Sequence, residues 1–203
     1  MLDCPDKPDG KHRRIETNPS RYLLYMDVLG GMFEKHTEPC YPDYYARYTK
    51  QLADAAQRSR HHGYMYDMLS KLCAVLEVKS RVGVDAQVAY KTGNRAALEQ
   101  IANRTLPELV ERLDVFNLTV ENRWMIEYKA SGYDVLDNRL GGVRNRIITA
   151  MRRINQYLSG EIDRIEELED TRLAFNGLPD EELEKDRVMC WGITRHLFTP
   201  NVY

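Results

Sequence analysis

The sequence contains few cysteines and no long hydrophobic run, and each of these absences excludes a class of protein. The four cysteines among the 203 residues lie far apart, so no two have the close spacing of a zinc knuckle or a redox pair. No apolar stretch approaches the roughly 20 residues of a membrane-spanning helix, and residues 1–14 lack the apolar centre of a signal peptide. We therefore expect a reduced, cytoplasmic protein, unless a signal sequence precedes it in a longer chain.

An excess of charge and the common cofactor-binding motifs are also lacking. The 29 basic and 31 acidic residues give a net charge of −2, which argues against a nucleic-acid or membrane partner. A weak nucleic-acid alternative rests on a group of arginines, namely Arg139, Arg144, Arg146, Arg152 and Arg153. Neither Gly-Gly doublet has the spacing or the lysine of a phosphate-binding loop. His61 and His62 are adjacent and would point to different faces of a helix, so we expect no metal and no cofactor.

Helical periodicity runs through most of the chain after residue 41. Apolar residues recur every three to four positions, most clearly from Leu140 to Leu158, and 43% of the residues are hydrophobic. The pattern predicts a mainly α fold, a helical bundle of about five or six helices with an extended N-terminal arm. Asn94 has the position of an N-cap, and Thr105-x-x-Glu108 has the form of a capping box, which predicts a helix break or kink near 104–107.

The N-terminal arm contains one apolar run, from Arg21 to Leu29, which ends in Gly30-Gly31. A short apolar run bounded by turn residues predicts a buried strand. A lone strand needs hydrogen-bonding partners, so the run indicates that a sheet lies elsewhere in a larger protein. We accordingly divide the chain into an arm, residues 1–40, and a helical domain, residues 41–203.

Several motifs, taken in their order and spacing, carry a resemblance to a known family. They are Asn-Pro-Ser-Arg-Tyr-Leu-Leu-Tyr-Met-Asp at 18–27, Trp-Met-Ile-Glu-Tyr-Lys at 124–129, Arg-Leu-Gly-Gly at 139–142 and Tyr-Leu-Ser-Gly-Glu-Ile at 157–162. Together they resemble family 20 glycoside hydrolases, in the subgroup of exo-β-N-acetylhexosaminidases that carries an all-helical domain after its catalytic barrel. The resemblance covers nearly the whole chain. It implies that the arm contains a strand from the end of a (β/α)8 barrel.

The resemblance also implies that the catalytic groups lie outside this chain. In this family the acetamido group of the substrate is the nucleophile, and an Asp-Glu pair on an earlier barrel strand orients it and protonates the leaving oxygen. The adjacent acidic residues of this sequence all fall between Glu166 and Glu182, in a stretch that has the pattern of a solvated surface. We therefore expect a non-catalytic C-terminal fragment of an enzyme that removes terminal β-linked N-acetylhexosamine.

Four residues are predicted to contact the sugar in the full-length enzyme. Tyr25-Met26-Asp27 resembles the Tyr-x-Asp element of a late barrel strand, whose tyrosine binds the acetamido oxygen and whose aspartate binds sugar hydroxyls. Trp124 and Glu127 resemble a late Trp-x-Glu element, with one extra residue between them. On a helix, residues i and i+3 share a face, so this ring and carboxylate can converge on one ligand. The structural alternative is a core tryptophan and a salt-bridged glutamate.

The remaining expectations concern partners. The helical domain is expected to support the barrel and the sugar pocket and to form a homodimer. The face of Tyr44, Tyr45 and Tyr48 is either the contact or part of the core. The competing function is a free-standing helical protein-interaction module that binds through the tyrosine-rich helix.

Overall fold

Helices make up most of the part of the chain that the structure describes. A computed structural model describes residues 14–15, 23–31, 37–172 and 187–188. Its four long helices are α2 (Tyr41–Arg58), α3 (Gly63–Lys91), α5 (Leu106–Glu127) and α6 (Tyr133–Ser159). The shorter elements are α4 (Arg95–Gln100), a π-helical turn (Ile101–Thr105), α7 (Glu166–Glu169) and the strands β1 (Arg14–Ile15) and β2 (Arg187–Val188), which pair in parallel. The prediction of a mainly helical protein with five or six helices is confirmed for these residues.

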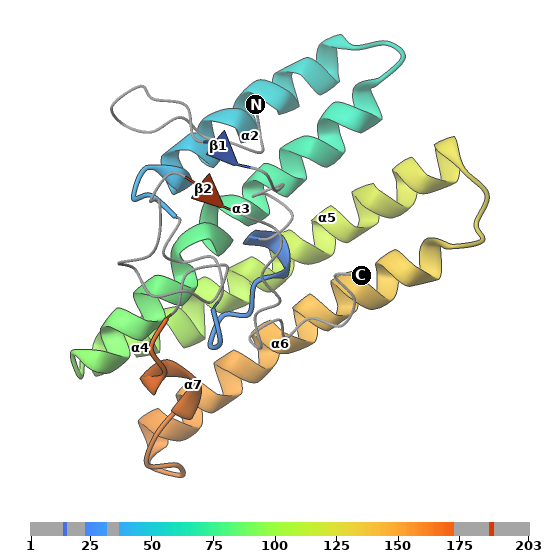
Figure 1. The fold of residues 1–203 in the computed structure, drawn as a ribbon. Helices are drawn as coiled ribbons and strands as arrows, with labels where there is room; N and C mark the ends of the chain where they lie inside the picture. Colours follow the sequence, from blue (N-terminus) through green and yellow to red (C-terminus); the bar gives the residue numbers. More distant parts are fainter. Residues whose placement is uncertain (1–13, 16–22, 32–36, 173–186, 189–203) are drawn as a thin grey trace.

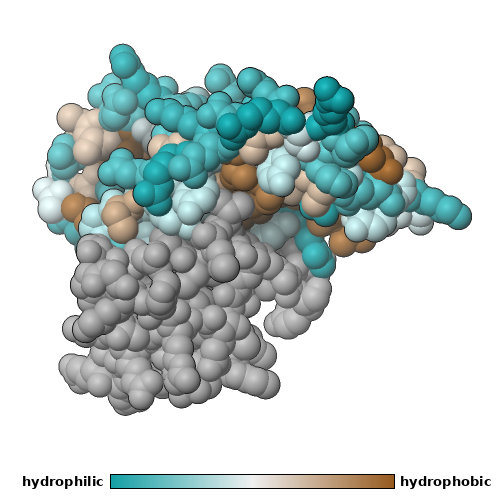
Figure 2. Space-filling model, turned by 90° about the horizontal axis from the view of Figure 1, so that it is seen from above, coloured by the Kyte–Doolittle hydropathy of each residue, from teal (hydrophilic) through white to brown (hydrophobic). Residues whose placement is uncertain are grey.

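The long helices pack in the order in which they follow one another along the chain. Helix α2 contacts α3, α3 contacts α5, and α5 contacts α6. The chain reverses its direction between α2 and α3 and again between α5 and α6 (Figure 1). Seen edge-on, these helices form a slab whose outer face carries mainly hydrophilic side chains (Figure 2). The buried apolar side chains of the helices pack against one another in a single cluster.

Residues 23–31 lie against the helical layer, and here one prediction was wrong. Leu23 to Tyr25 form a helical turn and residues 28–30 a second turn, so the strand predicted for 21–29 is absent from its described part. Leu23, Leu24 and Val28 are buried on a curved path, whereas successive side chains of a strand point to opposite faces. A short apolar run has no periodicity that separates a strand from a buried turn. The origin of the arm in a catalytic barrel, and the division at residue 40, stay predictions.

The core forms where the stripes of α3, α5 and α6 meet the 23–31 segment. Its fully buried members include Leu76 on α3, Leu109 and Leu113 on α5, and Ile147 on α6. In the segment, Leu23 and Leu29 are fully buried as well, and they belong to the same contiguous cluster as the helices. The segment is thus part of the hydrophobic core, and the helical layer depends on it for burial.

Two helix boundaries were predicted from local sequence, with different outcomes. Asn94 is the N-cap of α4, and its side chain accepts a hydrogen bond from the Ala97 amide at 3.1 Å, as predicted. Thr105 makes no capping bond, and the chain stays helical through a π turn that ends at this residue. Pro107 explains the irregularity, because its ring lacks an N–H and clashes with the carbonyl four residues earlier in a regular α-helix.

The tyrosine face of α2 is largely core. Tyr45 is fully buried, and Tyr44 and Tyr48 are partly buried against the same cluster. The rings of Tyr44 and Tyr48 lie 4.7 Å apart, and Tyr44 meets Tyr45 edge-on at 5.4 Å. Tyr45 therefore cannot contribute to a protein contact.

Within the described residues, no helix is sufficiently long and apolar to cross a membrane.

The buried and exposed leucines of α5 provide a direct test of this packing. Leu113 is 1% exposed and Leu118 is 61% exposed. Leu113→Ala should lower the free energy of unfolding by about 2–5 kcal/mol, because it opens a cavity in the core. The matched control, Leu118→Ala, should change it by less than about 0.5 kcal/mol. Urea unfolding measures both values, and equal effects of the two substitutions would contradict the orientation of α5.

Candidate functional site

Asp27 organises the turn that follows the first helical residues. Its Oδ1 atom accepts hydrogen bonds from the amides of Leu29, at 2.9 Å, and Gly30, at 2.8 Å. The amide of Gly31 donates to the carbonyl of Asp27 at 3.1 Å, and Gly31 has a φ of 55°, which glycine adopts readily. An aspartate at the first position of a tight turn favours this arrangement, since its side chain replaces a backbone acceptor.

Arg146 of α6 completes the coordination of this carboxylate. Its Nε atom donates to Oδ2 of Asp27 at 2.6 Å, across 119 positions of sequence. The Asp27 side chain is 1% exposed and that of Arg146 is 33% exposed. The pair is therefore a tertiary ion pair between a buried carboxylate and a guanidinium that is partly exposed at the surface.

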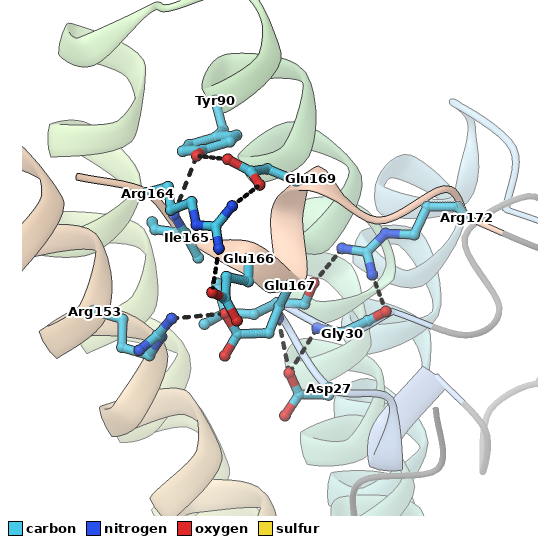
Figure 3. Close-up of polar contacts among 11 residues, drawn as sticks. Asp27, Gly30, Tyr90, Arg153, Arg164, Ile165, Glu166, Glu167, Glu169 and Arg172 are labelled. Atoms are coloured by element: carbon cyan, nitrogen blue, oxygen red, sulfur yellow. Dashed lines mark hydrogen bonds and ion pairs between the residues drawn. The ribbon is translucent and has the colours of Figure 1, made fainter. Parts of the chain in front are cut away.

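Two further cations hold the backbone of the same turn. Lys79 of α3 is fully buried, and its Nζ atom donates to the carbonyl of Met26. Arg172, which follows α7, donates to the carbonyls of Leu29 and Gly30 (Figure 3). We call the group of Asp27, Lys79, Arg146 and Arg172 the turn clamp. It binds the segment to α3, to α6 and to the chain beyond α7.

The short helix α7 positions the chain that leads to Arg172 of the turn clamp. Tyr90 of α3 donates to the carboxylate of Glu169 at 3.0 Å and accepts from the amide of Ile165 at 3.1 Å. Arg153 of α6 pairs with Glu167 at 2.9 Å (Figure 3). These contacts fix α7 between α3 and α6, so that the residues after it start from a defined place.

The surroundings of Asp27 keep it ionised. Burial raises the pKa of this carboxyl, but the hydrogen bonds from Arg146 and the Gly30 amide and the positive charges of Arg146 and Lys79 lower it by more. The resulting pKa lies below the usual value of an aspartate. Asp27 is accordingly a fixed carboxylate at neutral pH and has no proton to donate as a general acid.

Trp124 and Glu127 form a second group, at the turn between α5 and α6. The indole Nε1 of Trp124 donates to the carbonyl of Lys129 at 2.7 Å, and its ring lies 4.8 Å from that of Tyr128. Glu127 accepts from Arg123 at 3.0 Å and from the hydroxyl of Tyr64 at 3.2 Å. Both side chains are partly buried and carry internal hydrogen bonds.

Gly132 lies beside the indole of Trp124 in this turn. A Cβ atom at this position would lie 3.4 Å from the Trp124 ring, and the φ of 94° falls in the region that glycine favours. The rings of Trp124 and Tyr133 lie 6.2 Å apart. The turn therefore uses Trp124 to connect the end of α5 to the start of α6.

The four residues predicted to contact the sugar lie in two separate places. Tyr25 is half-buried and adjoins the clamp, whereas Trp124 contacts Tyr133 at the start of α6. Arg146, which binds Asp27, lies 13 residues beyond Tyr133 on this helix. At a rise of 1.5 Å per residue, the two places are roughly 20 Å apart along α6. The described chain thus does not bring the four residues together.

Other chemistry is limited in the part of the chain that the structure covers. No group of three or more histidine, cysteine or acidic side chains could hold a metal ion there. Burial raises the pKa of the Cys73 thiol to about 12, so this residue is not a nucleophile at neutral pH. Three of the grouped arginines have internal carboxylate partners, namely Arg144 with Asp114, Arg146 with Asp27, and Arg153 with Glu167.

The sequence motifs identify Asp27 but not the cations that hold it and its turn. One signal for Lys79 was available, since it continues the helical spacing of the buried residues Leu76 and Val82. A lysine on an apolar helix stripe must be buried with a partner or lift its amine to the surface. No comparable signal marked Arg146 or Arg172, because their partners lie more than 100 positions away.

The lowered pKa of Asp27 predicts a pH-dependent contribution to stability. An unfolded aspartate titrates near pH 4, so the clamp stabilises fully above that pH and progressively less as the pH falls through the lower native pKa. Asp27→Asn should cost about 2–3 kcal/mol at pH 7, and the gap in melting temperature should narrow between pH 4 and pH 2.

Asp114→Asn is the matched control, because Asp114 pairs with Arg144 in an exposed position on the helical layer. This substitution should cost about 0–1 kcal/mol. Thermal melts at a series of pH values measure both variants. A gap between wild type and Asp27→Asn that is the same at every pH would contradict an ionic role for Asp27.

A comparison with known families identifies what kind of domain these features belong to. Residues 1–189 match the Glycoside Hydrolase 20C C-terminal domain, which covers both the turn clamp and the α5–α6 turn. No curated protein matches the chain. The helical layer and the 23–31 segment both lie inside the matched range, and the match spans most of the 203 residues. The chain therefore belongs to the family of glycoside hydrolase 20C C-terminal domains.

Proposed function

We propose that this domain is the non-catalytic C-terminal part of a β-N-acetylhexosaminidase, in which it supports the catalytic barrel and one wall of the sugar pocket. The observation that carries the proposal is the family match over residues 1–189. The substrate class comes from the resemblance of the motifs at 18–27, 124–129 and 139–142 to family 20 enzymes. In such an enzyme the general acid and the orienting carboxylate come from the barrel.

The turn clamp gives the proposal a physical basis. The segment that resembles the end of the barrel is buried against the helices, and charges from α3, from α6 and from beyond α7 hold its backbone. A domain that only followed the barrel in sequence would need no such contacts. A domain that holds barrel-derived residues in place needs contacts of this kind, because a sugar site tolerates little displacement.

Two of the four predicted sugar contacts fit this proposal better than the others. Tyr25 and Asp27 belong to the held segment, whereas Trp124 and Glu127 lie roughly 20 Å away along α6. One terminal sugar ring cannot span both places. We therefore assign Tyr25 and Asp27 to the surroundings of the sugar pocket, and Trp124 and Glu127 to the α5–α6 turn, where their hydrogen bonds are internal.

The function is tested by comparing the isolated 203-residue chain with the full-length enzyme. The chain alone should not hydrolyse an aryl N-acetyl-β-glucosaminide, because the proposal places the general acid and the orienting carboxylate on the barrel. The full-length protein should release the aryl alcohol. A full-length protein without this activity would refute the proposal, as would turnover by the chain that disappears in the Asp27→Asn variant.

Exposed apolar side chains on α5 favour a protein contact at the helical layer. Val115, Leu118, Met125 and Ile126 are all at least 46% exposed. Such side chains are candidates for contact with a second copy or with the barrel, and they equally suit an interaction module. We include a two-fold dimer in the proposal because an apolar surface of this kind is self-complementary in a symmetric pair.

Light scattering tests the dimer. The 203-residue chain should have twice the monomer mass at micromolar concentration, and Leu118→Asp should shift it to the monomer while circular dichroism stays that of a folded helical protein. Val88→Asp on α3 is the matched control, since Val88 is also exposed but lies on another helix. A monomer at every concentration would refute the dimer. Dimers that persist in Leu118→Asp would place the contact elsewhere.

A further inference from the structure

The coordination of Asp27 leaves little room for a ligand. A carboxylate has about four acceptor positions, and three are used by Leu29, Gly30 and Arg146. The side chain is 1% exposed, so a sugar hydroxyl has no path to the remaining position. A residue that binds substrate directly has to present a free acceptor to the pocket, and Asp27 presents none in this arrangement.

We propose that Asp27 is a positioning residue and not a sugar ligand: through its ion pair with Arg146 it fixes the 26–31 turn, and with it the adjacent Tyr25, on the helical domain. The inference rests on the proposed function, because the place of Tyr25 matters for catalysis only in a hexosaminidase. It assigns to Arg146, a residue of the helical domain, an effect on the sugar site of the barrel.

The geometry of the clamp explains why this ion pair is the decisive contact. Lys79 and Arg172 donate to backbone carbonyls, which any residue would provide. Arg146 donates to a side chain, the Asp27 carboxylate, and that side chain also holds the amides of Leu29 and Gly30. Loss of either Asp27 or Arg146 therefore removes the same link between the turn and α6.

This shared link predicts non-additive effects. If Asp27 acts through Arg146, then either single substitution loosens the turn and the second has little left to remove. If Asp27 instead bound the sugar directly, its substitution would impair catalysis while Arg146→Gln would leave it nearly unchanged. A double-mutant cycle distinguishes the two roles.

The kinetic test uses the full-length enzyme with an aryl N-acetyl-β-glucosaminide. Asp27→Asn and Arg146→Gln should each lower kcat/KM about tenfold, and the double variant should be no worse than about the weaker single variant. Arg144→Gln is the matched control, since Arg144 is on the same helix and pairs with Asp114. It should behave as wild type. Additive losses, or an effect of Asp27→Asn alone, would overturn the inference.

Hydrogen exchange in the 203-residue chain provides a readout that does not depend on activity. The amides of Leu29 and Gly30 should exchange faster in Asp27→Asn and in Arg146→Gln, with Arg144→Gln unchanged. Unchanged exchange would overturn the clamp even if kcat/KM fell. A wild-type enzyme without hexosaminidase activity, but with faster exchange in both variants, would reject the proposed function and the sugar-site role while retaining the clamp.

A conservative variant covers the case in which Arg146→Gln does not fold. Arg146→Lys keeps the positive charge and can donate to one carboxylate oxygen, so it should restore part of kcat/KM and part of the protection from exchange. Thermal melts confirm that each variant is folded before the kinetics are compared. If Arg146→Lys is folded and loses as much kcat/KM as Asp27→Asn, the positioning role requires the geometry of arginine as well as its charge. If it is fully active although the amides of Leu29 and Gly30 exchange faster, the positioning role is refuted.

Discussion

Burial of the Asp27 carboxylate is the constraint that connects the arm to the helices. An ionised group removed from water requires compensation by hydrogen bonds and opposite charge. At this site the compensation comes from the backbone of the turn itself and from Arg146, with Lys79 close enough to lower the pKa further. The bond from Arg146 and the charge of Lys79 exist only when α6 and α3 are in place, so the full coordination of Asp27 forms only in the folded domain.

Such a pair contributes more to specificity than to net stability. Well-packed apolar residues often stabilise a protein as much as a buried ion pair does, but they can slide and repack. The hydrogen bonds of Asp27 and Lys79 require a single position of the 23–31 segment on the helices, because any shift would leave a buried charge without a partner. The apolar side chains around them, such as Leu23 and Leu29, provide most of the buried surface but do little to fix the position of the segment.

Sequence reasoning predicted the helices well because their signals are local. The stripe from Leu140 to Leu158 marks α6, and Asn94 has the position of a helix N-cap. The 21–29 run was misassigned because a short apolar stretch carries no period. The π turn before Pro107 and the pairing of Asp27 with Arg146 depend on tertiary structure, which no window of sequence contains. The motifs at Tyr25 and Asp27 identified a segment that matters, although not the partners that hold it.

The order of the helices along the row has a consequence for how the domain folds. Contacts between α2 and α3 and between α5 and α6 join neighbours in sequence, and such local pairings form quickly. The 23–31 segment instead depends on residues 119 to 143 positions away. During synthesis this segment is made long before Arg146 and Arg172, so its bonds to these two residues can form only after α6 and the chain beyond α7 have been made. The attachment of the 23–31 segment to Arg146 and Arg172 is therefore a late step of folding.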